Sequence, residues 1–352
     1  MRADKPLSRL IFTIYRHYRV MHGVRIALSF VATLLLVRLL ALPEGTWPLI
    51  TLVVVMGPVS FWGNVLPRAT ERIIGTLCGA LSGLVALKLA PWSPLLMLCW
   101  CLLVMFVSGW MTLGKKPYLA LLIGITLAVV IGTPDDDIRV ALWRVGDVII
   151  GSLLALLFSS LWPQKAWYHW RIQLADVFRD IARLGQASFS PNLVDRPRLN
   201  KPHQRLLSKV VNMRALIQPA GKESRVPRAV LEAIQTQNRN LVCTLELQIN
   251  AWWSSRESHL IMLNAPTLRR AQQMTHQSLE ALAQAVVTGD TDRLAANRAE
   301  MSAIVRELRA LIADANSEAL VETPIHGYVW LCLEQARQLT RLSELIRLAL
   351  RH

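Results

Sequence analysis

The sequence is poor in the residues that build catalytic, metal or disulfide centres. Its 352 residues include five cysteines, and no two of these have the spacing of zinc ligands or of a disulfide framework. No segment matches the glycine-lysine loop that holds nucleotide phosphates, the zinc-binding His-Glu-x-x-His helix or the Gly-x-Ser-x-Gly turn of hydrolases. The eight histidines are scattered. We therefore expect no enzyme activity, no cofactor and no metal site.

Negative charge is also scarce. The chain has 39 Lys and Arg residues against 24 Asp and Glu residues, which gives a net charge of +15. The excess is present in both halves of the chain, because 14 of the basic and 7 of the acidic residues precede residue 163. A basic balance spread in this way does not indicate a nucleic-acid partner. It is typical of a protein whose basic residues meet the anionic cytoplasmic face of a lipid bilayer.

Long apolar runs, in contrast, are abundant in the first half. A helix that crosses a bilayer needs roughly 20 apolar residues, and six segments approach or reach that length. The expected spans are residues 24–42, 47–62, 68–90, 92–113, 117–133 and 138–162. The second and fifth are the shortest. Turn-forming Gly and Pro residues separate the six segments.

After residue 163 the hydrophobic residues recur with a helical period, and no strand-like alternation stands out. The expected helices there are residues 166–187, 199–217, 227–255, 266–288, 291–315 and 319–350. We therefore predict an all-α membrane protein in three parts. These are a basic cytoplasmic N-terminal arm (1–23), a transmembrane domain (24–163) and a cytoplasmic helical bundle (164–352).

The charges of the loops predict the orientation. Six of the first 25 residues are basic and one is acidic, and Lys115 and Lys116 lie in the fourth loop. The acidic run Asp135–Asp137 lies in the fifth loop, on the other side of the membrane. Because Lys and Arg accumulate on the cytoplasmic side, both termini are expected there. The predicted location is the bacterial inner membrane, with several passes.

Two segments 76 residues apart carry the same pattern. Residues 68–81 read RATERIIGTLCGAL, and residues 144–157 read RVGDVIIGSLLALL. A weaker match relates Trp47-x-x-Ile50 to Tyr118-x-x-Leu121. With six spans, the third and sixth run in opposite directions, so the pattern predicts an inverted repeat of three plus three helices. Such repeats are common in transporters, with the substrate path at the repeat interface.

Charged residues open both copies of the pattern. Positions three and four apart share one face of a helix, so Arg68 neighbours Glu71 and Arg144 neighbours Asp147. Ionisable groups at membrane depth are costly and usually line a pathway. We expect three arginines to bind an anionic substrate: Arg68, Arg72 and Arg144. Glu71 and Asp147 would hold these arginines in place or exchange protons. The alternative is that the charges only anchor helix ends at the membrane surface.

Small residues follow the charges in the same register. They are Gly75, Gly79 and Gly83 in the first copy, and Gly151 and Ala155 in the second. Small residues at every fourth position allow membrane helices to approach closely. The sequence leaves open whether the close partner is in the same chain or across a dimer axis.

The two copies of the pattern and the six-segment layout resemble the fusaric-acid-resistance family, the aromatic acid exporters of bacterial inner membranes. The resemblance rests on RATERIIGTLCGALSG at 68–83 and RVGDVIIGSLLALLFSSLWP at 144–163, within the first 165 residues. It implies export of organic anions, with aromatic carboxylates as substrates. Larger members carry two membrane domains, which implies a homodimer here. A remoter similarity to plant aluminium-activated malate transporters agrees with a dimer. The rival hypothesis is a membrane scaffold or sensor that transports nothing and binds a partner through its helical domain.

Overall fold

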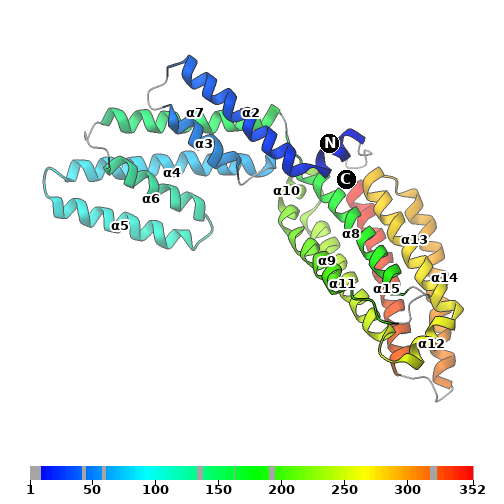
Figure 1. Cartoon of the computed structure of the whole chain (residues 1–352). Coiled ribbons are helices and arrows are strands. Elements are labelled where there is room, and N and C mark those ends of the chain that lie inside the picture. The colour runs from blue at the N-terminus through cyan, green and yellow to red at the C-terminus, as the bar shows by residue number, and fades with distance from the viewer. Residues whose placement is uncertain are drawn as a thin grey trace. The chain divides into compact units, whose positions relative to one another are not determined.

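The computed structural model describes residues 9–41, 45–57, 61–132, 138–161, 163–189, 195–317 and 323–351. All regular secondary structure in these ranges is helical (Figure 1). The chain divides into two compact units, one formed by residues 17–165 and one in which 9–16 join the chain after residue 165. The acidic run Asp135–Asp137, the end of the N-terminal arm before residue 9 and His352 lie outside the described ranges.

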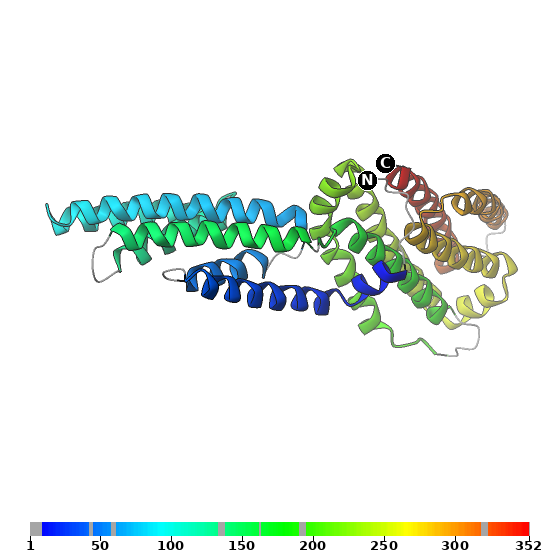
Figure 2. The ribbon, with the colours of Figure 1, turned by 90° about the horizontal axis from the view of Figure 1, so that it is seen from above.

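The unit of residues 17–165, called the membrane unit below, contains one helix at each expected span. These are α2 (Tyr18–Leu39), α3 (Thr46–Met56), α4 (Trp62–Leu89), α5 (Pro94–Thr112), α6 (Pro117–Ile131) and α7 (Ile138–Leu161). Helices α4, α5 and α7 run nearly parallel in Figure 1, where α2 is inclined to them, and α2, α4 and α7 look nearly parallel in Figure 2.

Four helices of this unit, α2, α4, α5 and α7, are long and apolar enough to cross a membrane. Helices α3 and α6 are apolar but have only 11 and 15 residues. At 1.5 Å per residue they reach about 17 Å and about 23 Å, short of a hydrocarbon core of roughly 30 Å. The prediction of apolar helices is confirmed, and two of the six are shorter than a full span.

Helix α5 shows why this unit belongs in lipid. Leu98, Leu102, Phe106 and Trp110 are 63–75% exposed on its outer face, and Ser108 is its one buried residue. A row of large apolar side chains on the outside is unfavourable in water and favourable against acyl chains.

The second unit, called the helical unit, consists of nine helices in the described residues. They are α1 (Arg9–Arg16), α8 (Ala166–Ser188), α9 (Asn200–Asn212), α10 (Arg214–Ser224), α11 (Arg228–Trp252), α12 (Arg256–Asn264), α13 (Pro266–Thr288), α14 (Asp292–Ser317) and α15 (Thr323–Arg351). Its core lies between α8, α11, α13 and α15.

Two details of this unit differ from the sequence-based expectation. The helix expected at 199–217 is divided at Met213 into α9 and α10, and both parts keep an apolar face, so the hydrophobic period does not record the break. The short helix α12 was not predicted. Ser255 begins it as an N-cap, because its hydroxyl accepts a hydrogen bond from the Ser258 N–H group at 3.0 Å.

A buried arginine fastens α8 to the end of α13. Arg171 is 1% exposed, and its guanidinium donates to the carbonyl oxygens of Val286 at 2.7 Å and Val287 at 3.2 Å. The last carbonyls of a helix have no partner within the helix and carry partial negative charge. Arg171 therefore satisfies two groups that would otherwise be buried without a donor.

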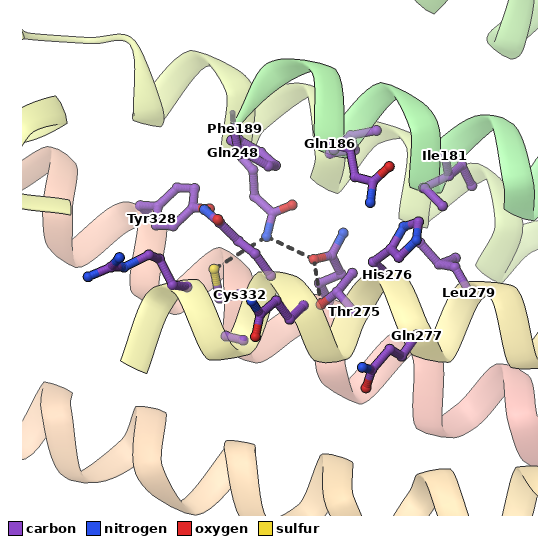
Figure 3. A pocket seen from close by; sticks show the side chains of 18 residues that line it. Ile181, Gln186, Phe189, Gln248, Thr275, His276, Gln277, Leu279, Tyr328 and Cys332 are labelled. Atoms are coloured by element: carbon purple, nitrogen blue, oxygen red, sulfur yellow. Dashed lines mark hydrogen bonds between the residues drawn. The ribbon is translucent and has the colours of Figure 1, made fainter. Parts of the chain in front are cut away.

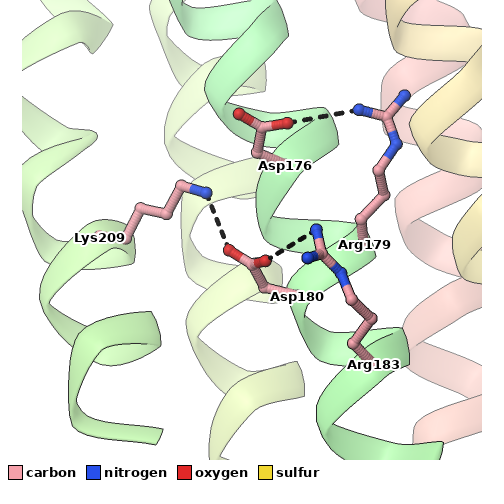
Figure 4. Close-up of polar contacts among 5 residues, drawn as sticks. All are labelled: Asp176, Arg179, Asp180, Arg183 and Lys209. Atoms are coloured by element: carbon pink, nitrogen blue, oxygen red, sulfur yellow. Dashed lines mark hydrogen bonds and ion pairs between the residues drawn. The ribbon is translucent and has the colours of Figure 1, made fainter. Parts of the chain in front are cut away.

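The outer face of α8 carries a different kind of charge contact (Figure 4). Asp180 accepts from Lys209 of α9 at 2.9 Å and lies 3.2 Å from a guanidinium nitrogen of Arg183. Asp176 pairs with Arg179 at 3.3 Å. These side chains are partly exposed, and such pairs contribute about 0–1 kcal/mol each.

The contrast between these arginines gives a stability prediction. Arg171→Met should lower the free energy of unfolding of the helical unit by about 2–4 kcal/mol, because it leaves buried carbonyls without donors. Arg183→Met should change it by less than about 0.5 kcal/mol. Denaturation of the full chain in mild detergent, followed by helical circular dichroism, would measure both. Equal midpoints for the two variants would contradict the assigned role of Arg171.

Candidate functional site

The glycine face of the first repeat copy packs against α6. A Cβ atom built on Gly75 would lie 2.7 Å from Leu122 Cβ, and one on Gly79 would lie 2.6 Å from Thr126 Cβ. One on Gly83 would lie 2.6 Å from Val130 Cγ1. These separations are too short for any side chain, so glycine is what allows α4 and α6 to touch.

The second copy packs against α3 in the same way. A Cβ atom on Gly151 would lie 2.7 Å from the Pro48 carbonyl oxygen and 2.8 Å from Thr51 Cβ. Ala155, fully buried, belongs to the cluster of Leu52 and Val55. Helix α4 therefore packs on α6, and helix α7 packs on α3. The small-residue faces are filled within one chain, which decides the question that the sequence left open.

The leading arginines of the two copies make matching contacts. The guanidinium carbon of Arg68 lies 3.5 Å from the centre of the Tyr118 ring, and that of Arg144 lies 5.6 Å from the centre of the Trp47 ring. Both are cation–π contacts with an aromatic residue in the first turn of a short helix. Trp47 and Tyr118 are the residues that the weaker repeat match pairs.

A small cavity brings two of the predicted arginines together. Arg72 is 6% exposed and Arg144 is partly buried, and both line a space of about 20 Å³ with Trp47 and Thr76. Apart from Thr126, the remaining lining is apolar, and it comes mainly from α6 and α7. Arg144 Nη1 also donates to the Val129 carbonyl oxygen at 2.9 Å. Arg68, the third predicted arginine, does not line this cavity.

The two predicted carboxylates have different surroundings. Asp147 has no exposed surface, whereas Glu71 is partly exposed. Among the described residues no ion pair joins Glu71 to Arg68 or Arg72, and Arg68 lies over the Tyr118 ring instead. Asp147 is therefore the more buried of the two carboxylates.

Sequence reasoning missed a polar cluster in α2. Arg25 is 4% exposed, and its Nη2 donates to His22 Nδ1 at 3.3 Å. His22 Nε2 in turn donates to the Gly57 carbonyl oxygen at 3.1 Å. The spacing of three residues between His22 and Arg25 was the available signal. In the sequence, Arg25 belongs to the basic N-terminal region and His22 is one of the scattered histidines, so neither stands out as part of a site.

Comparison with known proteins decides the family. The profile of the Fusaric acid resistance protein family matches residues 19–351. The chain belongs to this family. The match includes the helical unit as well as the membrane unit, so the family relationship extends beyond the first 165 residues in which the sequence patterns were found.

Individual relatives agree with this assignment. The chain is 55% identical over 351 residues to the inner membrane protein YeeA of Escherichia coli strain K12, and the alignment covers all of both proteins. It is 30% identical over 163 residues to the p-hydroxybenzoic acid efflux pump subunit AaeB of Edwardsiella ictaluri, covering 42% of the chain and 25% of that protein. It is 24% identical over 327 residues to AaeB of Yersinia pestis, covering 87% of the chain and 46% of that protein.

These relationships set the general class of the protein. Family membership and the long apolar helices make it a multi-pass inner-membrane protein. At the level of the family it is a membrane efflux protein and not an enzyme.

Proposed function

We propose that this protein exports organic anions, specifically aromatic carboxylates, across the inner membrane through the cavity between Arg72 and Arg144. The observation that carries the proposal is that two arginines, from corresponding helices of the repeat, line the same small cavity in a largely apolar unit. An arginine fork can bind a carboxylate with two parallel hydrogen bonds. The name of the AaeB relatives, p-hydroxybenzoic acid efflux pump subunit, supports an aromatic acid as substrate.

An inverted repeat is part of this proposal. Its support is the reciprocal packing, in which Gly75 meets the Leu119 carbonyl and Leu122 while Gly151 meets the Pro48 carbonyl and Thr51. These partners correspond when Tyr118 is aligned with Trp47. In an inverted repeat the two halves run in opposite directions through the membrane. A site at the interface between them can open first to one side of the membrane and then to the other.

The size of the cavity places a condition on transport. About 20 Å³ is room for roughly one water molecule, so the described conformation is closed to an aromatic acid. Binding then requires α4 and α7 to move apart where Arg72 and Arg144 meet. Asp147, buried one turn after Arg144, would steady the arginine or carry a proton during that step.

The orientation proposed for this transport has both termini in the cytoplasm. Reporter fusions after Lys116 and at the C-terminus should therefore give cytoplasmic signals, whereas a fusion at Asp136 should give a periplasmic one. The physical reason is the retention of Lys and Arg on the cytoplasmic side. A periplasmic signal from the C-terminus would contradict both the orientation and the inverted repeat.

We also propose that the protein works as a homodimer. The support is length, because the chain covers 46% of the Yersinia pestis AaeB, about half of that pump subunit. Two copies would supply a similar number of membrane helices. Native mass spectrometry in mild detergent should give the mass of two chains, and a monomer at every concentration would count against the dimer.

Flux through the purified protein tests the proposed function. The full chain would be reconstituted into liposomes loaded with labelled p-hydroxybenzoate, and release would be followed with and without an imposed pH gradient. We expect saturable release above that of protein-free liposomes. A membrane scaffold that transports nothing would leave release at the protein-free rate under both conditions.

A further inference from the structure

A large cavity that is partly open to solvent lies in the helical unit, and its residues are distinct from those of the proposed transport site. Helices α8, α11, α13 and α15 surround a space of about 610 Å³ (Figure 3). This is within the range of roughly 300–1,000 Å³ that small-molecule sites occupy. Six glutamines line the space, together with Arg269, His276 and several apolar side chains.

One glutamine in the cavity is incompletely satisfied. Gln248 is 1% exposed, and its Nε2 donates to Gln335 Oε1 at 3.1 Å and to Cys332 Sγ at 3.5 Å. Its Oε1 is buried and accepts no hydrogen bond. Figure 3 shows this amide pointing into the cavity. A buried acceptor without a donor is unfavourable, so the position suits a ligand that brings a hydroxyl or N–H group.

The charge of the cavity selects against cations. No Asp or Glu occurs among the described residues that line it, whereas the solvent-exposed Arg269 contributes a positive charge. Burial raises the pKa of the Cys332 thiol to about 12 and the pKa of Tyr328 well above its usual value, so both stay neutral at pH 7. Coulombic attraction to Arg269 therefore favours an anionic ligand.

The apolar part of the lining favours a flat ring. The rings of Phe189 and Tyr328 are 5.8 Å apart at one end, and Trp252 packs behind both. Leu245 and Leu279 add aliphatic surface. Aromatic rings pack well against such side chains in edge-to-face or offset geometry.

We propose that this cavity is a binding site for a small aromatic acid that carries a hydroxyl or N–H group away from its carboxylate. The donor group would hydrogen-bond to Gln248 Oε1, and Arg269 would attract the carboxylate. The site belongs to the helical unit alone, so it does not rest on the transport function proposed for the membrane unit.

Gly185 of α8 allows the cavity to be filled without disturbing its walls. A Cβ atom there would lie 3.8 Å from Leu245 Cδ1 and 4.0 Å from Phe189 Cε2, which are ordinary contacts. Gly185→Phe should place a ring in the cavity and abolish binding. Gly185→Ala adds one methyl group and should keep the affinity within about threefold, while favouring the helix. Circular dichroism of both variants would check that the fold is retained.

Three probes test separately whether the cavity recognises the hydroxyl group and the carboxylate of the ligand. Calorimetric titrations of the full chain in detergent would use p-hydroxybenzoate, benzoate and p-hydroxybenzamide. Loss of the hydroxyl in benzoate should weaken binding about tenfold, because Gln248 Oε1 stays without a donor. Arg269→Gln should weaken p-hydroxybenzoate binding but leave the uncharged amide unchanged. Arg270→Gln is the matched control, since Arg270 pairs with Glu307 at 2.8 Å and does not line the cavity.

The membrane unit could bind the same probes, so Arg144→Ala is titrated beside Gly185→Phe. A heat of binding that is measured with Arg144→Ala and is absent with Gly185→Phe comes from binding in the cavity of the helical unit. Heat that persists unchanged in a folded Gly185→Phe variant, or no saturable heat from the wild-type protein with any probe, would overturn the inference. Failure of the liposome flux test would leave this result unaffected.

Discussion

Arg144→Ala is expected to reduce release of p-hydroxybenzoate from liposomes to the protein-free rate, while the variant still inserts and purifies normally. Arg144 lines the proposed cavity and contacts Trp47 and the Val129 carbonyl. Alanine removes both the charge and the donors that would bind a carboxylate. Initial release rates at matched protein content would measure the loss.

Conservative variants show whether Arg144 binds substrate or only anchors a helix. Arg144→Lys should remain roughly tenfold below wild type, because lysine keeps the charge and loses the planar pair of donors. An anchoring role would let lysine substitute freely, since either long cation can reach the interface. Equal release from wild type, Arg144→Ala and Arg144→Lys would remove this residue from the mechanism.

Asp147→Asn tests the buried carboxyl next to it. Asparagine keeps the size of the group and cannot carry the charge or exchange the proton, so release should fall whichever of the two roles Asp147 has. If the role is proton exchange, the variant should also lose any response of release to the imposed pH gradient. If Asp147 only steadies Arg144, the response to the gradient should survive at a lower rate.

The structure distinguishes the other two arginines. From sequence, Arg68→Ala is expected to be milder than Arg144→Ala because Arg72 can take over part of its charge, and loss of both Arg68 and Arg72 is expected to be severe. Arg72 lines the cavity with Arg144, whereas Arg68 lies over Tyr118 outside it. Arg72→Ala alone should therefore be severe, and Arg68→Ala milder.

Gly151→Ala is expected to destabilise the membrane unit by about 1–3 kcal/mol, the usual range for an extra methyl group in a packed interior. The new methyl would meet backbone atoms of Pro48 at 2.7–2.8 Å, and backbone cannot move aside as a flexible side chain can. The helices α3 and α7 would have to separate, so transport should fall as well.

Gly146→Ala is the matched control in the same helix. Nothing lies within 4 Å of a Cβ atom at Gly146, so alanine should be neutral or stabilise the helix by up to about 1 kcal/mol. Thermal unfolding of both variants in one detergent would compare them. Equal midpoints would mean that α3 and α7 are not in close contact, and the reciprocal packing would then have to be abandoned.

The sequence by itself determined the features that depend on neighbouring residues along the chain. The position of each apolar helix followed from the length of each run, because lipid requires a continuous apolar surface and internally bonded backbone. The repeat, its shared register of charges and glycines, and the absence of familiar catalytic motifs were equally local. These features were sufficient to recognise the family. They also pointed to Arg72 and Arg144, the two of the three predicted arginines that line the cavity.

Only the tertiary structure decided which distant residues meet. The glycine faces could have faced a second copy, and they face α6 and α3 of the same chain. Arg72 and Arg144 share a cavity although 72 positions separate them, whereas Arg68 turns to Tyr118. The cavity of the helical unit draws on residues from 181 to 335 and has no local motif. Side chains that converge from four helices are set by packing and not by spacing along the chain, so no periodicity in the sequence could reveal them.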